Sequence, residues 1–183
     1  MENAYSVLTA SGPDRVGIVD DISGIVAEKN CNIEDSRMAV LGGEFAVIML
    51  VSGAQEAVGA LMKALPGRGE GLGLSIECRA TRAPRGKEEG RPYFLEVVSL
   101  DTPGIVHSVT AVLRKSGANI ESLETDTGAA PWTGAPMFRM KAHIVVESGQ
   151  RVSDLRGALA RLQGDRDLDI VLKPAFPSAG DEE

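Results

Sequence analysis

The chain has 183 residues, enough for one large domain or two small ones. Its hydrophobic fraction of 43% and charged fraction of 25% are ordinary for a soluble globular protein. The longest strongly apolar run, residues 45–51, is too short to span a bilayer. With a net charge of -7, direct binding of nucleic acid is also not expected, because it requires a basic surface.

Two further features bear on where the protein works. The only cysteines, Cys31 and Cys78, form no C-x-x-C pair and are expected to be reduced, small, buried hydrophobic residues. The start, Met1-Glu2-Asn3, lacks the positive charge of a secretory signal peptide. We therefore expect a cytoplasmic protein.

The first half of the chain begins with alternating strand and helix signals. Residues 5–10 are rich in β-branched and aromatic side chains, which predicts a strand. An amphipathic helix follows, because apolar residues recur at i, i+1, i+4, i+7 and i+8: Ile18, Val19, Ile22, Ile25 and Val26. Residues 32–41 and 44–51 predict two strands joined by a tight hairpin at Gly42-Gly43.

A second helix and a fourth strand complete this half. Ser52 is a candidate cap for a helix whose buried stripe would be Val58, Leu61, Met62 and Leu65. The glycine-rich residues 67–73 are expected to form a flexible loop before a strand at about residues 74–82. Glu70 in the middle of this loop argues against phosphate binding. The predicted order is β-α-β-β-α-β.

The second half repeats the first at an offset of 87 residues. Asp14-Arg15-Val16-Gly17-Ile18-Val19 aligns with Asp101-Thr102-Pro103-Gly104-Ile105-Val106. Without a gap, Asn32-Ile33-Glu34 then aligns with Asn119-Ile120-Glu121. The apolar positions of the intervening helix keep the same register, so a duplication explains the agreement better than chance.

The remaining signals of the second half follow the same order. Strands are predicted at residues 93–100, 119–125, 137–146 and 169–173, with a second helix at 151–163. Each half should fold as an α+β, ferredoxin-like unit, in which a four-stranded antiparallel sheet carries two helices on one face.

Proline, glycine and charged residues mark the ends of the two predicted domains. We place the domains at residues 1–82 and 93–174, a linker at 83–92 and a loose acidic tail at 175–183. An insertion at 128–136 contains Trp132, which could cover a site or pack over the sheet edge or a partner.

At these residues the chain resembles the ACT domain family. The βαββαβ order, Asp-x-x-Gly-Ile-Val at the first strand-helix turn and Asn-Ile-Glu at the next strand start carry the resemblance, and each motif has a counterpart in the other half. Residues 12–19, Gly-Pro-Asp-Arg-Val-Gly-Ile-Val, are also similar to the glycine cleavage system transcriptional repressor family. The resemblance covers about residues 4–174.

The resemblance implies regulation. ACT domains typically bind an amino acid or similar effector at the interface between two domains, and they commonly pair edge to edge into an eight-stranded sheet. They transmit binding to an enzyme or a transcription factor. The family's ligand contacts come from the strand-helix loop and the start of the second strand, which here are Asp14, Arg15, Val16, Gly17, Ile18, Asn32 and Ile33, then Asp101, Thr102, Pro103, Gly104, Ile105, Asn119 and Ile120.

The chemistry of these residues fits such a ligand. A helix start exposes unpaired N–H groups and the positive end of the helix dipole, which suits a carboxylate. Gly17 and Gly104 carry no Cβ to keep a ligand from these amides. Asn32 and Asn119 can both donate and accept hydrogen bonds.

Structural roles remain open for the same positions. Asp14 and Asp101 could cap the helices. The two glycines could let helix and strand pack closely, and the two asparagines could satisfy the backbone of a turn. Because Thr102 stands where the first half has Arg15, the two sites would differ in affinity or ligand.

Catalysis has little support in the sequence. His107 lies on the polar side of its predicted helix and is expected to be exposed or to cap it. His143 lies in a predicted strand with no Cys or His at metal-ligand spacing, so it is expected to be structural. No G-x-S-x-G, P-loop or H-E-x-x-H motif occurs. We expect no enzyme activity, cofactor or metal.

The leading hypothesis is a regulator that binds an amino acid such as glycine and acts on a protein partner such as a transcription factor. It would work as a homodimer or by ACT pairing within one chain. Two alternatives are a ligand-free dimerisation or interaction module, and an accessory subunit of an amino-acid or one-carbon enzyme.

Overall fold

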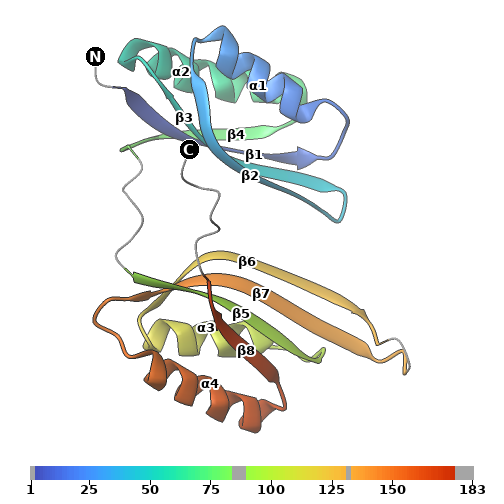
Figure 1. Cartoon of the computed structure of the whole chain (residues 1–183). Helices are drawn as coiled ribbons and strands as arrows, with labels where there is room; N and C mark the ends of the chain where they lie inside the picture. The colour runs from blue at the N-terminus through green and yellow to red at the C-terminus, as the bar shows by residue number, and fades with distance from the viewer. Residues whose placement is uncertain (1–2, 84–89, 131–132, 176–183) are drawn as a thin grey trace. The chain divides into compact units, whose positions relative to one another are not determined.

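A computed structural model describes residues 3–83, 90–130 and 133–175 of the chain. It divides into two compact units, residues 1–85 and 86–183, and each unit has its own hydrophobic core (Figure 1). Trp132, most of the linker and nearly all of the acidic tail, for which we made predictions, lie outside the described residues. No helix in the described ranges is both long and apolar enough to cross a membrane.

The first unit has the predicted order of elements. It consists of β1 (Ala4–Pro13), α1 (Ile18–Glu28), β2 (Asn32–Leu41), β3 (Glu44–Gly53), α2 (Gln55–Leu72) and β4 (Ser75–Thr81). The strands form an antiparallel sheet in the order β2-β3-β1-β4, with both helices on one face (Figure 1).

The second unit repeats this arrangement. It consists of β5 (Gly90–Leu100), α3 (Ile105–Lys115), β6 (Ala118–Ala129), β7 (Pro136–Glu147), α4 (Val152–Arg166) and β8 (Asp169–Pro174). Its antiparallel sheet has the order β6-β7-β5-β8. The prediction of two α+β, ferredoxin-like units in tandem is therefore confirmed.

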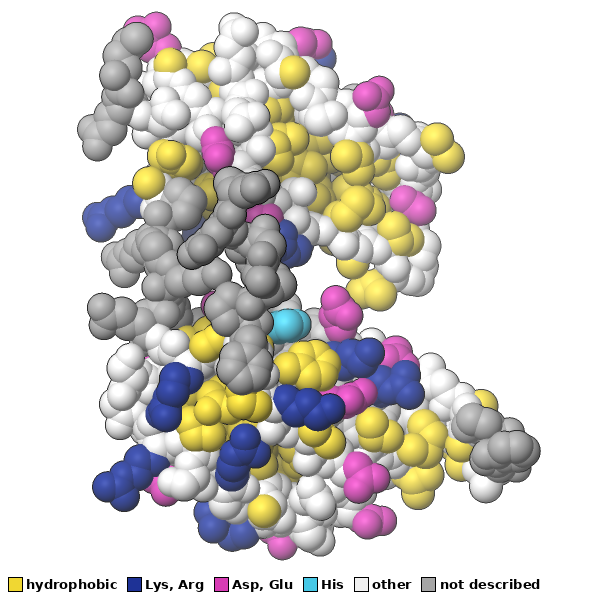
Figure 2. Space-filling view, viewed as in Figure 1, with side chains coloured by type: hydrophobic (Ala, Val, Ile, Leu, Met, Phe, Trp, Pro, Cys, Tyr) yellow, Lys and Arg dark blue, Asp and Glu magenta, His cyan; other side chains and the backbone are white. Residues whose placement is uncertain are grey.

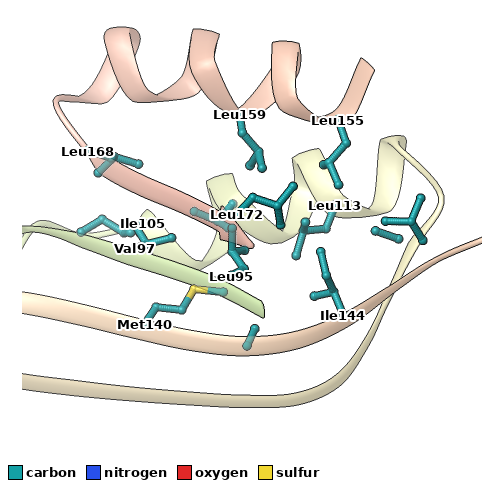
Figure 3. Close-up of a cluster of buried hydrophobic side chains, with 14 of the residues drawn as sticks. Leu95, Val97, Ile105, Leu113, Met140, Ile144, Leu155, Leu159, Leu168 and Leu172 are labelled. Atoms are coloured by element: carbon teal, nitrogen blue, oxygen red, sulfur yellow. The ribbon is translucent and has the colours of Figure 1, made fainter. Parts of the chain in front are cut away.

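The core of each unit is formed by the apolar side chains that alternate along the strands and by the apolar stripe on one face of each helix. In the second unit, leucines of α3, α4 and β5 converge with Met140 and Ile144 of β7 between the helices and the sheet (Figure 3). In the first unit, the stripe of α1 is buried as predicted except for Val19, which is 42% exposed. Val19 follows the buried Ile18 by about 100° around the helix, which turns its side chain away from the sheet.

The glycine-rich segment differs from its prediction as a loop. Residues 67–72 belong to α2, which continues through Pro66 and ends at Gly73 in the left-handed conformation. Packing outweighs the low helix propensity, because Gly69 lets α2 approach β4 closely. A Cβ on Gly69 would lie 2.7 Å from a side-chain carbon of Ile76.

The start of α2 also differs from the prediction. Ala54, not Ser52, is the residue that precedes the helix, and no side chain caps it. Ser52 is the ninth residue of the ten-residue strand β3 and is 2% exposed. Its hydroxyl is therefore available for a contact within the sheet.

Each unit contains a β-bulge at the repeated Asn-Ile-Glu motif. In the first unit Ile33 pairs with Val51 and Asp35 with Leu50, so Glu34 is an extra residue on β2. The second unit shows the same shift around Glu121 on β6. A bulge moves every later side chain to the opposite face of the strand, so each motif sets which residues of its edge strand face the helices.

Candidate functional site

The two strand-helix turns have the same backbone conformation. Gly17 and Gly104 precede α1 and α3 with φ angles of 92° and 88°, in the left-handed region. Their carbonyls accept the first helical hydrogen bonds, from the N–H groups of Asp21 at 2.9 Å and Ser108 at 3.0 Å. The amides of the first helical turn are left without acceptors in a regular helix, which makes each turn suited to an anion.

The predicted capping role of the two aspartates is wrong. No side chain caps α1 or α3, because the glycines occupy the capping positions. The backbone N–H groups of Asp14 and Asp101 instead donate to the carbonyls of Gly43 and Pro136, each at 2.9 Å. These bonds fix the end of the first strand of each unit to the neighbouring hairpin.

Close packing does not explain the two glycines either. A Cβ on Gly17 would come no nearer than 4.0 Å to another group, and one on Gly104 no nearer than 3.7 Å. The backbone conformation therefore requires glycine at both positions, because a left-handed φ angle strains other residues. The space beside each glycine is open except for an arginine side chain.

An arginine lies beside each turn, but it comes from a different part of each unit. In the first unit Arg15 belongs to the turn itself and forms an ion pair with Asp21 at 2.8 Å. In the second unit Arg166, at the end of α4, donates to the carbonyl of Pro103 at 3.5 Å. Arg166 is 63 residues from Pro103, so sequence comparison finds only Thr102 in place of Arg15.

The charge around the two turns differs. The first turn of α1 carries Asp20 and Asp21, whereas that of α3 carries no acidic residue. Carboxylates stabilise a helix N-terminus but repel a second anion there. Arg166 and the absence of acidic side chains from the first turn of α3 therefore make the second turn the better site for a carboxylate.

The predicted site residues of one unit fall at opposite ends of its sheet. Asn32 pairs with Ser52, which pairs with Tyr5 near the start of β1, whereas the glycine turn follows Pro13 at the other end. Eight steps of about 3.3 Å separate these ends, or about 26 Å. An amino acid cannot bridge that distance, so one unit brings only half of the predicted site together.

Asn32 is part of a polar cluster on the face of the sheet opposite the helices. Its amide donates a hydrogen bond of 3.2 Å to Oε1 of Glu34, and the Ser52 hydroxyl donates to the same oxygen. Both hydrogen bonds lower the pKa of Glu34, and the bond from Ser52 has the larger effect. Asn32 thus orients a carboxylate rather than satisfying the backbone of a turn.

Asn119 has different surroundings in the second unit. With Ile120 it lines a depression of about 520 Å³ whose other polar side chains are Thr110, Arg114 and Glu147. Val145 occupies the position across from Asn119 that Ser52 occupies across from Asn32. The two strand starts therefore offer different polar groups to a ligand.

Other cavities and the histidines lie apart from the predicted site. A shallow depression of about 570 Å³ in the first unit contains no predicted site residue. His107 is exposed on α3, and the ring of His143 packs edge-on against Phe94 with centroids 5.4 Å apart. Across the described ranges, no three His, Cys, Asp or Glu side chains are grouped to hold a metal ion.

Comparison with known proteins extends these observations. The ACT domain family matches residues 4–79. The glycine cleavage system transcriptional repressor of Escherichia coli K12 is 38% identical over 126 residues, which make up 69% of this chain and 66% of that protein. The matched length exceeds that of either unit, so the similarity extends over both.

Two solved structures match nearly the whole chain. The structure of an unknown protein from Galdieria sulphuraria is 38% identical, with a TM-score of 0.80 over 96% of this chain and 100% of that one. A structure provisionally described as a glycine cleavage system transcriptional repressor is 25% identical, with a TM-score of 0.74 over 97% and 100%. The repressor and the ACT domain, to which this chain is similar, are described as regulatory and not as enzymes. The chain belongs to the ACT-domain proteins, with two units in tandem, and is similar to the glycine cleavage system transcriptional repressors.

Proposed function

We propose that this protein binds an amino acid, such as glycine, and thereby changes its affinity for a protein partner. The observation that carries the proposal is the repeated pair of half-sites, a left-handed glycine turn and an asparagine strand start, at opposite ends of each sheet. A complete site needs the turn of one ACT unit and the strand start of a second ACT unit. Effector binding would then favour one arrangement of units over another.

The two half-sites suit the two ends of an amino acid. At the turn, the free amides and the helix dipole would bind the carboxylate, with the guanidinium of Arg15 or Arg166 beside it. Asn32 or Asn119 would contribute hydrogen bonds from the strand start. Val16 is fully exposed and Val106 is 36% exposed, so apolar groups would also lie near the ligand.

Edge-to-edge pairing of ACT units would supply the second half-site. β2 and β6 each have a single neighbour in their sheets and therefore present free backbone groups. β2 also exposes Met38 by 55% and Val40 by 45%. The free strand edges and the exposed apolar side chains of β2 support edge-to-edge pairing, either within one chain or in a homodimer.

The partner would be a protein, such as a transcription factor, in the cytoplasm. The similarity to a transcriptional repressor supports a role in transcription, while the net charge of -7 disfavours direct contact with DNA. By linkage, a partner that binds the effector-loaded form more tightly must raise effector affinity by the same factor.

A ligand-free interaction module, or an accessory subunit acting in the same way, is the second candidate. Asp20 and Asp21 favour it, because they place two carboxylates where the first turn would receive an anion. The exposed apolar side chains of β2 would serve protein contact equally well.

A thermal-shift screen with the twenty amino acids separates the two candidates. An amino acid at 100 times its dissociation constant should stabilise the protein by about 2.7 kcal/mol. Asn32→Ala combined with Asn119→Ala should remove that shift. A folded wild-type protein that no amino acid stabilises would contradict effector binding and leave the interaction module.

A further inference from the structure

The Asn-Ile-Glu motif does more than start a strand, because the bulge at Glu34 gives that residue a defined position. Asn32 and Ser52 lie opposite each other on the face of the sheet away from the helices. Glu34, two residues after Asn32, projects to the same face, and its carboxylate reaches both side chains. The cluster therefore combines one acidic and two neutral polar groups.

Ser52 holds the carboxylate from within the sheet. It is 2% exposed and donates its hydroxyl hydrogen to Oε1 of Glu34, and the Asn32 amide donates to the same atom at 3.2 Å. Two donors on one oxygen restrict the rotation of the Glu34 side chain. Because both donors are neutral, the negative charge of the carboxylate is oriented but not cancelled.

Glu34 is exposed and has no cationic partner within the described ranges. The arginines nearest in sequence are engaged elsewhere, since Arg37 pairs with Asp35 and Arg15 with Asp21. A fixed carboxylate with accessible charge, next to an amide, is an acceptor for a small cation such as an ammonium group.

We propose that Glu34 is the residue of the first unit that binds the α-ammonium group of an amino-acid effector, with Ser52 as its positioning residue. This inference rests on the proposed function and names the group that selects for amino acids. The effector's ammonium donates hydrogen bonds to the Glu34 carboxylate, which discriminates against α-hydroxy acids of the same shape. Those acids carry the carboxylate but no cationic group.

The second unit provides a matched control. Glu121 occupies the same bulge, but Val145 stands where Ser52 stands in the first unit and has no hydroxyl to donate. The Asn-Ile-Glu motif is identical in both units, but only Glu34 has a serine hydroxyl across the strand to orient its carboxylate. We therefore assign ammonium binding to Glu34 and not to Glu121.

The test compares E34Q with E121Q in the full-length chain. Binding is measured by calorimetry with glycine, alanine and serine, and with glycolate, lactate and glycerate as their α-hydroxy counterparts. E34Q should weaken binding of the amino acids by about 10- to 100-fold, the range for loss of a charge-assisted hydrogen bond. The α-hydroxy acids should bind E34Q and wild type alike, and E121Q should behave as wild type. Circular dichroism and the Tm verify that both variants fold.

The possible failures are distinguishable. If wild type binds the amino acids and E34Q binds them equally well, the assignment of Glu34 is overturned while the proposed function stands. If E121Q weakens binding as much as E34Q, the role of Ser52 in distinguishing the units is overturned. If none of the amino acids binds wild type, the proposed function fails and this inference fails with it.

Discussion

The two units share a backbone but carry opposite chemistry on the sheet face away from their helices. β3 places Ala46, Ile48 and Leu50 there, opposite Ser11, Thr9 and Val7 of β1. At the same positions of the second unit, β7 places Arg139, Lys141 and His143, opposite Val98, Glu96 and Phe94 of β5. In the view of Figure 2, hydrophobic side chains predominate over part of the first unit, while basic and acidic side chains lie among hydrophobic ones over the second.

On this face of the second unit, residues of opposite charge lie across from one another on neighbouring strands. Lys141 lies between Glu96 and Glu124, and Arg139 lies opposite Asp126, with 3.9 Å between their charged atoms. Cross-strand pairs of opposite charge stabilise a sheet that faces water. After a duplication, the inward-facing residues must keep filling the same core, whereas outward-facing ones are free to change. The two units therefore differ in their exposed sheet faces and in their half-sites, but not in their backbone fold.

The largest effects are expected where the units are alike. Leu61 of α2 and Leu155 of α4 occupy corresponding positions, and both are completely buried. Leu61→Ala and Leu155→Ala should each destabilise their own unit by about 2–5 kcal/mol, through lost burial and the cavity left behind. Hydrogen exchange followed by mass spectrometry would locate the loss. Equal loss of protection in both units from either substitution would show that the units do not unfold independently.

A smaller and again equal cost is expected at the glycine turns. Gly17→Ala and Gly104→Ala force a side chain into a left-handed backbone, at about 1–2 kcal/mol each. Chemical denaturation of the two variants measures this cost. A neutral effect at either position would mean that the turn relaxes to another conformation, and the shared geometry would then not be required.

Arg15 and Arg166 should separate the two turns in effector binding. Arg166→Ala should weaken binding of a stabilising amino acid by about 10-fold, within the range for a charge-assisted hydrogen bond. Arg15→Ala should have a smaller effect, because Asp21 already offsets its charge at 2.8 Å. Neither should change stability by more than about 1 kcal/mol, because both side chains are exposed, Arg15 in a surface ion pair and Arg166 in a long hydrogen bond to a carbonyl. Calorimetric titration of both variants tests the order, and the reverse order would assign the carboxylate to the first turn.

The features of the fold that follow from hydrophobic periodicity and from the internal repeat were predictable from the sequence. The order of elements, the buried stripes and the two units follow from spacings such as that of Ile18, Ile22 and Ile25, which the core requires. The length of α2 could not be predicted, because the helix depends on close contact between Gly69 and Ile76. Local propensity contains no information about that contact.

The candidate site was predictable only in part for the same reason. The repeated motifs identified both turns and both strand starts, but not that they lie at opposite ends of each sheet. The role of Arg166 depends on the path of α4 and that of Ser52 on the register of β3. Neither residue belongs to a repeated motif, so comparing the two halves of the sequence does not identify either one.

The smallest expected effect is the pH dependence that Glu34 contributes. Its pKa is lowered in the folded protein, so its ionised form adds stability at pH values above the ordinary carboxyl pKa. That contribution is lost as the pH falls through the lowered pKa. Ser52 is the main cause of the shift, so Ser52→Ala should raise the pKa of Glu34 toward its ordinary value. Titration of the Glu34 carboxyl carbon by NMR measures this directly in wild type and variant. An unchanged pKa in the variant would mean that the hydroxyl does not hold the carboxylate, and the chemical difference between the two bulges would disappear.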